Sequence, residues 1–578
     1  MKDLTKLTDN QRRRELELLK ERRRILGLTP EKALDAILEA PLPVTLVQSF
    51  AEEDLHLLVH AIGPDDALPV LALASNEQWD YLCDVETWVH DRMDTNALTQ
   101  WWQRLLKADP DRFTHWISRQ KTDTLEYYLF HNIEVVMREH DQDPADLGDE
   151  FISEDQTHFF KLRPFPRPDQ EEQKEARDAL VLDLLKRLAV FDYPSYVAAL
   201  LESSSLLPAE AEEEAYRLRS LRMAEKGFLP YDDAVGVYQA LSVEEFLKRP
   251  LDSKQEVGGR AVDAYPLPQE PSRAGREADL FTRTLDRIQD QATLHRLQAE
   301  FAGLCNQVIS ADQRVVREKA VLQQVVAKAS GYLSIGLEKI AAEAGAQPYG
   351  PANLIQRYLL LNIFRVGYGC ALALKWKADR WLQGSWFMRN GLPLSFWSES
   401  GLGILGGLLL KKPLYFDNYA TGVLYREFAS LEDIDKTAQG LETIIAFDDL
   451  LALLKASPVR DEAPGTLTHK NLLLTLWADQ VLGIEAPSGL PVPLTLDQFR
   501  TLGATLWGSR SLPRQVGAKA KENCLNWLAA RSGLTADEIS QRMGPALEAL
   551  FGEIEQEVGQ VETRFLDPRY ISLFLFKK

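Results

Sequence analysis

The chain has 578 residues, of which 45% are hydrophobic and 26% charged, and its formal net charge is −20 at pH 7. This length exceeds what one hydrophobic core usually supports, so we expect two to four domains. The acidic balance argues against nucleic-acid binding, which normally needs a basic face, and against docking on anionic membranes by charge alone. No run of about 18 apolar residues is present, so no membrane span is expected.

The four cysteines, Cys83, Cys305, Cys370 and Cys524, are scattered and form no CxxC pair. Their spacing excludes a dense disulfide framework and favours a reducing compartment. The first 24 residues, MKDLTKLTDNQRRRELELLKERRR, contain no apolar core of a secretory signal. We therefore expect a cytoplasmic protein.

Residues 1–145 are predicted to form an N-terminal segment of short helices. Within 42–137 the sequence carries a weak internal repeat of 46 residues, in which Pro64 recurs as Pro110. Helical units of about this length stack on their neighbours because one unit cannot bury its apolar face alone. The stretch resembles the helical repeats in the N-terminal domain of MgtE magnesium transporters and in flagellar motor switch proteins. That resemblance implies a stack of short helices.

Seven of the nine histidines lie in the first 160 residues. His56 and His60 are four residues apart, and Glu53 precedes His56 by one turn, so a helix would place all three on one face. Such residues are metal ligands, although the HExxH motif and the second Glu-x-x-His of a di-iron bundle are absent. Metal binding by this segment is therefore an alternative to partly buried histidines without a ligand.

Two linkers are expected. Residues 146–170 are acidic and then proline-rich, and residues 251–275 are rich in proline, glycine and serine. The linkers would separate a middle helical segment, 171–250, from the N-terminal segment and from a C-terminal helical domain, 276–578. The middle segment contains a predicted helix-turn-helix over Pro208–Tyr238.

Pro208 suits the first turn of this predicted helix, and Gly227 suits a left-handed cap at its end. Asp232 or Asp233 would begin the second helix. We expect a solvent-exposed helix that serves as a capped hinge between an N-terminal stack of short helices and a C-terminal helical core. Elsewhere, helix starts are predicted from capping boxes, at Ser242 with Glu245, Ser310 with Gln313, Thr495 with Gln498 and Thr535 with Glu538.

The C-terminal domain is predicted to be helical throughout. Residues Asn353 to Leu382 are apolar on nearly every face, which predicts one long buried helix. Gly401–Gly406 matches GxGxxG, yet the dinucleotide fingerprint requires a preceding strand and a βαβ unit, so no cofactor is predicted. No stretch shows sustained strand alternation. The predicted fold class is all-α: a multi-segment helical protein with N-terminal short-helix repeats and a larger C-terminal helical core.

Candidate site residues come from the charges in that apolar helix. Arg357, Arg365 and Lys375 interrupt it, and buried cations need partners, which Glu399 or Asp417 are placed to supply. The pattern favours ordinary ion pairs within the protein, and the alternative is a pocket in the C-terminal domain near these five residues. Because GxSxG, Walker and kinase motifs are absent, catalytic residues stay unknown and the sequence favours a non-enzyme.

The stretch EEEAYRLRSLRMAEKGFLPYDDAVGVYQAL resembles part of a bacterial family of similar full length and unknown function. That resemblance covers most of the chain and implies a bacterial cytosolic protein, but no activity. Our leading hypothesis is a helical scaffold or adaptor that binds other proteins. The alternatives are an enzyme or small-ligand sensor with a pocket in the C-terminal domain, and divalent-metal sensing by the N-terminal segment.

Overall fold

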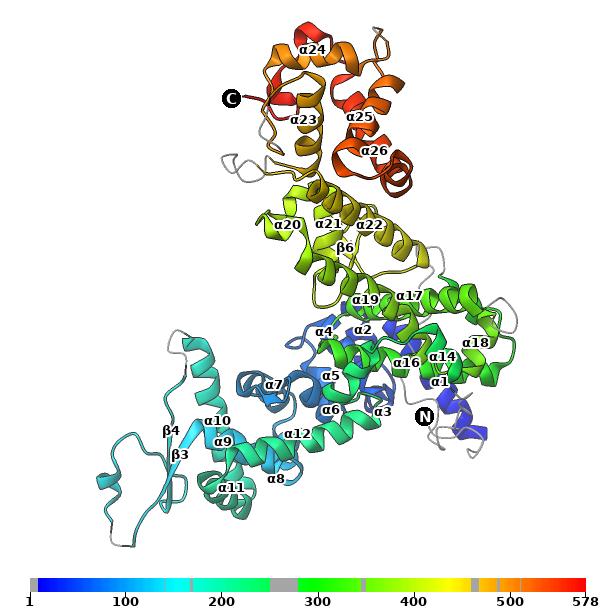
Figure 1. The fold of residues 1–578 in the computed structure, drawn as a ribbon. Coiled ribbons are helices and arrows are strands. Elements are labelled where there is room, and N and C mark those ends of the chain that lie inside the picture. The colour runs from blue at the N-terminus through cyan, green and yellow to red at the C-terminus, as the bar shows by residue number, and fades with distance from the viewer. Residues whose placement is uncertain are drawn as a thin grey trace. The chain divides into compact units, whose positions relative to one another are not determined.

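A computed structural model of the chain describes residues 9–140, 142–166, 170–249, 279–344, 350–458, 467–485, 489–509 and 511–577. The predicted linker at 251–275 lies outside these residues. The described residues are mostly helical, and their strands form three small antiparallel pairs, which confirms the all-α class (Figure 1). None of the helices in the described ranges is both long and apolar enough to cross a membrane.

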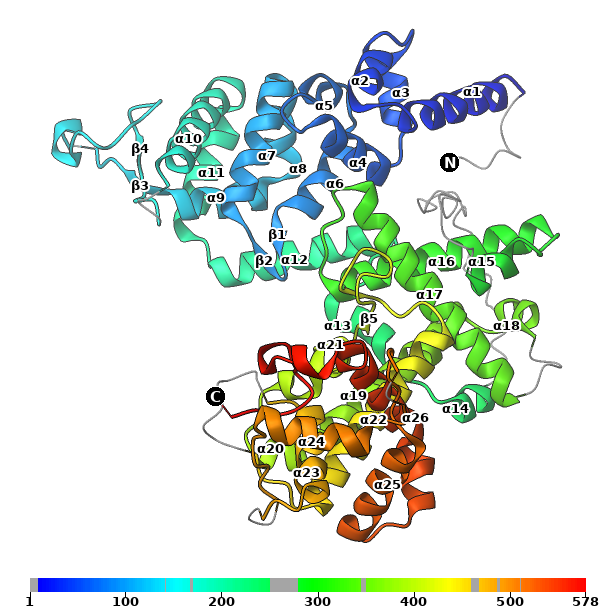
Figure 2. The ribbon, with the colours of Figure 1, turned by 90° about the horizontal axis from the view of Figure 1, so that it is seen from above.

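The described residues belong to two compact units. The first draws on Met1–Gln239, Arg249–Ser330 and Gln347–Phe364, and the second on Ala240–Lys248, Gly331–Ala346 and Arg365–Lys578 (Figure 2). The helices of the first unit are α1 (Asp9–Leu26), α2 (Pro30–Leu38), α3 (Pro43–Ser49), α4 (Glu52–Ile62), α5 (Leu68–Leu73), α6 (Asn76–Glu86), α7 (Thr95–Ala108), α8 (Pro110–Gln120), α9 (Thr122–Asn132), α10 (Glu171–Phe191), α11 (Tyr193–Ser205), α12 (Pro208–Glu225), α13 (Tyr231–Ala234), α15 (Leu280–Leu285), α16 (Gln291–Asp312) and α18 (Pro351–Arg357). Those of the second are α14 (Val243–Lys248), α20 (Trp386–Arg389), α21 (Ser398–Leu408), α22 (Leu431–Leu453), α23 (His469–Val481), α24 (Leu496–Leu506), α25 (Ala518–Ser532) and α26 (Ala536–Val558). Two helices, α17 (Lys319–Ala344) and α19 (Leu360–Gly384), contribute residues to both units.

One hydrophobic core runs through most of the first unit. It extends from Ile25 to Leu200 and includes Trp79, Trp102 and Trp116, each almost fully buried. The rings of Trp79 and Trp116 meet edge to face with centroids 5.7 Å apart, an arrangement that aromatic pairs prefer. The N-terminal short helices and helices α10 and α11 of the predicted middle segment therefore share a core.

A hairpin interrupts the helices of this unit. Strand β3 (Ile133–Met137) pairs antiparallel with β4 (His158–Leu162), from Ile133 opposite Leu162 to Met137 opposite His158. Asp155 stabilises the approach to β4 by accepting hydrogen bonds from the backbone N–H groups of Thr157 and His158. The predicted linker at 146–170 thus contributes a strand. The sequence concealed it because five-residue strands rich in Ile, Val and Phe are too short to show alternation.

The other strands are shorter. They are β1 (Trp88–Val89), β2 (Arg92–Met93), β5 (Tyr415–Phe416) and β6 (Tyr425–Arg426), with β1 paired to β2 and β5 to β6. Each pair is only two residues long, so it closes a turn between helices and does not form a layer of the fold.

Helix α12 ends as predicted. Gly227 adopts a left-handed conformation with φ of 85°. The N–H of Phe228 donates to the carbonyl of Met223 at 3.0 Å, and the N–H of Gly227 donates to that of Ala224 at 3.0 Å. These two bonds form a Schellman motif, in which glycine avoids the steric cost of positive φ.

Helix α12 is exposed at Glu213, Glu214 and Arg217, as expected for a solvent-exposed helix, but the expectation is wrong at Glu212. Glu212 is buried and accepts hydrogen bonds from the Tyr127 hydroxyl at 3.1 Å and the Met93 N–H at 3.0 Å. Arg222 donates twice to the Asp84 carboxylate, at 2.7 Å each. These contacts fix α12 to α6, α9 and β2 within the first unit. Its predicted role as a hinge stays a prediction.

The apolar stretch from Asn353 to Leu382 is not one helix. Helix α18 ends where the N–H of Tyr358 bonds the carbonyl of Leu354 and Tyr358 becomes extended, with φ of −114° and ψ of 153°. Helix α19 then begins at Leu360, whose N–H donates to the carboxylate of Glu300 at 2.6 Å. A side chain from α16 therefore caps the second helix, an interaction that local hydrophobicity does not reveal.

The GxGxxG stretch lies within helix α21, which packs on strand β5. A Cβ on Gly403 would lie 2.4 Å from the Phe416 ring, and one on Gly406 would lie 2.6 Å from the Tyr425 hydroxyl. A larger residue at either position would force the Phe416 ring or the Tyr425 side chain to shift, so these glycines let the β5–β6 hairpin approach the helix. Close packing accounts for the motif without a nucleotide.

Candidate metal centre

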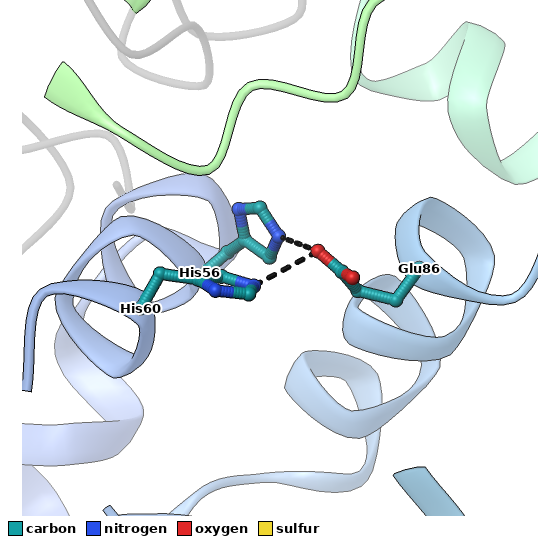
Figure 3. Close-up of side chains that lie close together, drawn as sticks. All are labelled: His56, His60 and Glu86. Atoms are coloured by element: carbon teal, nitrogen blue, oxygen red, sulfur yellow. Dashed lines mark hydrogen bonds and ion pairs between the residues drawn. The ribbon is translucent and has the colours of Figure 1, made fainter. Parts of the chain in front are cut away.

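Helices α4 and α6 pack together in the first unit and carry the polar cluster shown in Figure 3. Helix α6 begins with a capping box, in which Ser75 and Gln78 satisfy each other's backbone N–H. Its last residue, Glu86, faces His56 and His60, which lie one turn apart on α4. The buried apolar faces of both helices fix this approach, so the three side chains meet in a protected position.

The geometry of the cluster is compact. The Nε2 atoms of His56 and His60 lie 2.8 and 2.9 Å from the same oxygen of Glu86, Oε1. The ligand atoms of the three residues all lie within 4.8 Å of one another. Because an ionised carboxylate only accepts hydrogen bonds, both imidazoles donate through Nε2–H. Only 3% of the Glu86 side chain is exposed.

Arg317 completes the cluster from the connection between α16 and α17. Its Nη2 donates to Glu86 Oε2 at 2.8 Å, and its Nε lies 3.1 Å from Oε2 and 3.2 Å from Oε1. In contrast to the buried Glu86 that it contacts, 53% of the Arg317 side chain is exposed. Glu86 thus accepts hydrogen bonds from two imidazoles and one guanidinium.

The cluster shifts the protonation of its members. Burial would raise the pKa of Glu86, but the hydrogen bonds from His56, His60 and Arg317 outweigh it and hold that pKa well below its usual range. Burial lowers the pKa of His56, although its hydrogen bond to Glu86 acts in the opposite direction. The result is a carboxylate facing a neutral imidazole, and these are the protonation states in which the two groups bind metals.

The predicted ligand Glu53 does not join the group that the structure brings together. It lies one turn before His56 and is only 7% exposed, and neither of its carboxylate oxygens has a hydrogen-bond partner among the described residues. Burial raises the pKa of Glu53 to about 7. The sequence identified His56 and His60 but missed Glu86 and Arg317. Glu86 lies 30 residues from His56, and Arg317 lies 231 residues from Glu86, so no local spacing indicates either partner.

A small cavity of about 90 Å³ also lies in the first unit. Trp88, Trp102 and Trp116 line it, together with Lys121 and Arg222. Both cations are already engaged, Lys121 with Asp80 at 2.8 Å and Arg222 with Asp84 at 2.7 Å. Their charges are therefore neutralised within the protein, and the cavity offers less chemistry than the histidine cluster.

The five candidates from the C-terminal domain are spread over several elements. Arg357 ends α18 and is exposed, and Glu399 is exposed in the first turn of α21. Arg365 is half-buried on α19, and its carbonyl accepts the N–H of Leu241 at 3.4 Å. Lys375 pairs with Asp379 on the same helix at 3.2 Å, in place of the expected Glu399 or Asp417. A pocket near these residues stays a prediction.

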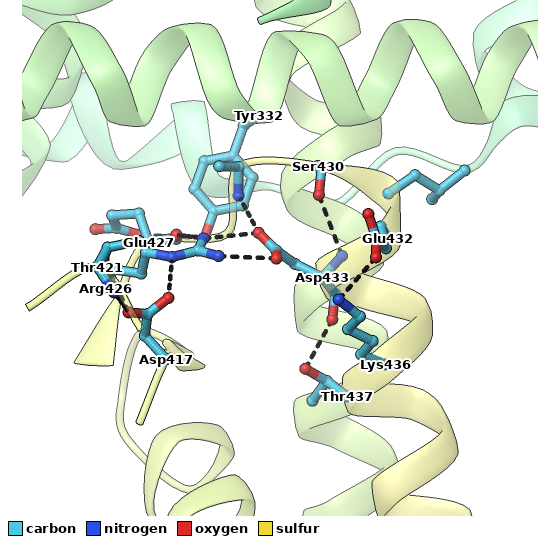
Figure 4. Close-up of polar contacts among 12 residues, drawn as sticks. Tyr332, Asp417, Thr421, Arg426, Glu427, Ser430, Glu432, Asp433, Lys436 and Thr437 are labelled. Atoms are coloured by element: carbon cyan, nitrogen blue, oxygen red, sulfur yellow. Dashed lines mark hydrogen bonds and ion pairs between the residues drawn. The ribbon is translucent and has the colours of Figure 1, made fainter. Parts of the chain in front are cut away.

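Asp417, the fifth candidate, belongs to a network in the second unit that is centred on Arg426 (Figure 4). Arg426 Nε donates to Asp417 at 2.7 Å, while its two terminal nitrogens donate to Asp433 at 2.7 and 2.9 Å. Asp417 also accepts the N–H and the hydroxyl of Thr421. Burial would lower the pKa of Arg426, but its bonds to Asp433 and Asp417 raise it. The network ties the turn between β5 and β6 to the start of α22.

The chain belongs to a family of unknown function (DUF6178), whose model matches residues 10–577. The resemblance to an uncharacterised family over most of the chain is thereby confirmed. Neither the curated proteins nor the solved structures contain a match to the chain. The likeness of residues 42–137 to MgtE helical repeats is therefore not shown.

Proposed function

We propose that the first unit binds a divalent transition-metal ion through His56, His60 and Glu86 and thereby acts as a metal sensor. The observation that carries the proposal is the convergence of three ligand atoms, from two packed helices, within 4.8 Å. Two imidazoles and one carboxylate are a common protein ligand set for zinc, which leaves a fourth position for water or another ligand.

The ligand types favour a late first-row metal over magnesium or calcium. Imidazole nitrogen suits zinc, nickel, copper and iron, whereas magnesium and calcium prefer sites made wholly of oxygen. Each imidazole would move its proton from Nε2 to Nδ1, which exposes the Nε2 lone pair. Bonds of about 2.0–2.2 Å in a tetrahedral site would widen each N···O separation to about 3.3–3.6 Å, a small adjustment.

The test is metal binding by the 578-residue chain after treatment with a chelator. We expect Zn²⁺ and Co²⁺ to bind in calorimetry at one ion per chain, and Mg²⁺ not to bind. At a free ion concentration of about 100 Kd, the metal should stabilise the first unit by about 2.7 kcal/mol. Bound Co²⁺ should also show a visible absorption spectrum typical of low coordination number.

A matched pair of variants assigns the binding to this cluster. His60→Ala should lower the affinity by at least about tenfold, because it removes one of three ligands. His115→Ala should leave the affinity unchanged, because His115 is exposed on α8 and lies outside the cluster. Equal zinc affinity in both variants, or no zinc uptake by the unmodified chain, would contradict the proposal.

A second candidate function is protein binding, as expected for a scaffold or adaptor. It is supported by the corner between α10 and α11, where Val190, Phe191 and Tyr193 are 86%, 50% and 47% exposed. Adjacent exposed apolar side chains favour a binding surface. Val190→Ser with Phe191→Ser should release a partner that co-purifies with the unmodified chain. Retention of that partner by the double variant would contradict this role for the corner.

A further inference from the structure

We propose that Arg317 is a displaceable clasp, which holds Glu86 while the site is free of metal and which the incoming ion must remove. This inference rests on the proposed metal site and concerns how the site is regulated. It follows from the way in which Arg317 and a metal ion would share one carboxylate.

In the metal-free chain, Glu86 Oε1 accepts from both imidazoles, and Oε2 accepts from Nε and Nη2 of Arg317. A carboxylate offers about four lone-pair sites, so these bonds occupy them until the imidazoles present their Nε2 lone pairs to an ion. Arg317 Nε, 3.2 Å from Oε1, is then the cation left beside the oxygen that the ion would bind. A divalent ion bound to the same carboxylate would also repel the adjacent guanidinium. Metal binding and the seated Arg317 are therefore in competition.

Among the three donors to Glu86, Arg317 is the one that can leave. His56 and His60 are needed as ligands and are largely enclosed by the protein, with 3% and 13% of their side chains exposed. Arg317 is half exposed, so its guanidinium can turn into water without leaving a buried charge behind. Its route away from Glu86 would also open the path by which an ion enters.

Release of Arg317 would also affect the backbone of the connection between α16 and α17, which carries this residue. Helix α16 ends at Asp312, its cap residue Gln313 adopts a left-handed conformation with φ of 51°, and α17 begins at Lys319. Among the described residues, the salt bridge from Arg317 to Glu86 ties this short connection to α6. Metal binding would break this salt bridge and release the connection. Because such coupling is reciprocal, anything that holds the connection in place would weaken metal binding.

The experiment measures zinc affinity in Arg317→Met, which keeps an apolar stem and removes the charge. We expect this variant to bind Zn²⁺ about tenfold more tightly than the unmodified chain, within the usual range of coupling between sites. The matched control is Arg314→Met, which removes an exposed cation from the same connection and should leave the affinity nearly unchanged. Arg317→Lys keeps the charge but loses the two-pronged contact. Its zinc affinity should lie between those of Arg317→Met and the unmodified chain.

A second readout follows the connection itself. On zinc binding, the backbone amides of residues 313–318 should exchange hydrogen faster in the unmodified chain, and should not change in Arg317→Met. Equal zinc affinity in Arg317→Met and the unmodified chain, or unaltered exchange on binding, would overturn the clasp while leaving the metal site intact. Absence of zinc binding in all variants would overturn both proposals.

Discussion

The two units each contain a buried cluster of charged and polar groups, but the clusters are built in opposite ways. In the second unit the centre is a cation, Arg426, held between the carboxylates of Asp417 and Asp433 (Figure 4). In the first unit the centre is an anion, Glu86, held by two imidazoles and the exposed side chain of Arg317 (Figure 3). The Arg426 network of the second unit consists of charged groups that stay in place. The Glu86 cluster of the first unit includes groups that can change protonation or leave.

That difference separates a structural network from a candidate site. A guanidinium has no lone pair and does not lose its proton in proteins, so Arg426 can only hold its partners in place. An imidazole can shift its proton between two nitrogens and present a lone pair to a metal ion. The density of polar contacts is therefore a poor guide to function. The better guide is whether the donors can be exchanged for a ligand.

The largest effect is expected when Arg426 is removed. Arg426→Ala leaves two buried carboxylates, Asp417 and Asp433, without their cation, and should lower the free energy of unfolding of the second unit by about 3–5 kcal/mol. Hydrogen exchange of the amides of α22 measures this loss. As a control, Lys436→Ala breaks an exposed pair with Glu432 and should cost less than about 0.5 kcal/mol.

A pH-dependent effect is expected from Glu53, because this carboxylate is buried without a hydrogen-bond partner among the described residues, and the attraction of Lys226 does not offset its burial. Burial raises its pKa from 4.5 to about 7. Its contribution to stability is therefore full below pH 4.5 and is lost as the pH rises through 7. Glu53→Gln should match the unmodified chain at about pH 4.5 and be more stable at about pH 8, by at most about 3 kcal/mol.

The control for this measurement is Glu52→Gln at the neighbouring position. Glu52 pairs with Lys226, so the substitution should not give a gain in stability at high pH. Thermal unfolding at several pH values in the presence of a chelator measures both variants. A constant difference between Glu53→Gln and the unmodified chain across this range would show that Glu53 does not titrate near pH 7.

The parts of the fold that could be predicted from the sequence depend on neighbouring residues. The glycine cap at Gly227 and the capping boxes at Thr495 and Thr535 are confirmed, because each forms within one turn of the chain. The capping box at Ser310 is wrong. Ser310 lies inside α16, which continues to Asp312. The capping-box spacing therefore occurs here at the end of a helix and does not mark the start of one.

The parts that could not be predicted depend on distant contacts. The break between α18 and α19 depends on Glu300, which is 60 residues from Leu360. The candidate metal centre could be predicted only in part, since helical spacing predicts that His56 and His60 share a face. Its carboxylate and its arginine come from other elements, and only packing of the first unit brings them to the histidines. Sequence spacing therefore identifies ligands on one helix but not the cluster.

The smallest of the expected effects tests whether the Glu86 cluster really differs from the Arg426 network. Glu86→Ala, studied with a chelator present, leaves two imidazoles with unpaired N–H groups and an arginine that can turn into solvent. We expect a loss of about 1–3 kcal/mol in the free energy of unfolding of the first unit. Glu86→Gln keeps an acceptor oxygen, so it should lower the free energy of unfolding by less than Glu86→Ala does. A loss in Glu86→Ala as large as that in Arg426→Ala would mean that the cluster holds fixed charges, which would remove the reason for assigning it to a metal.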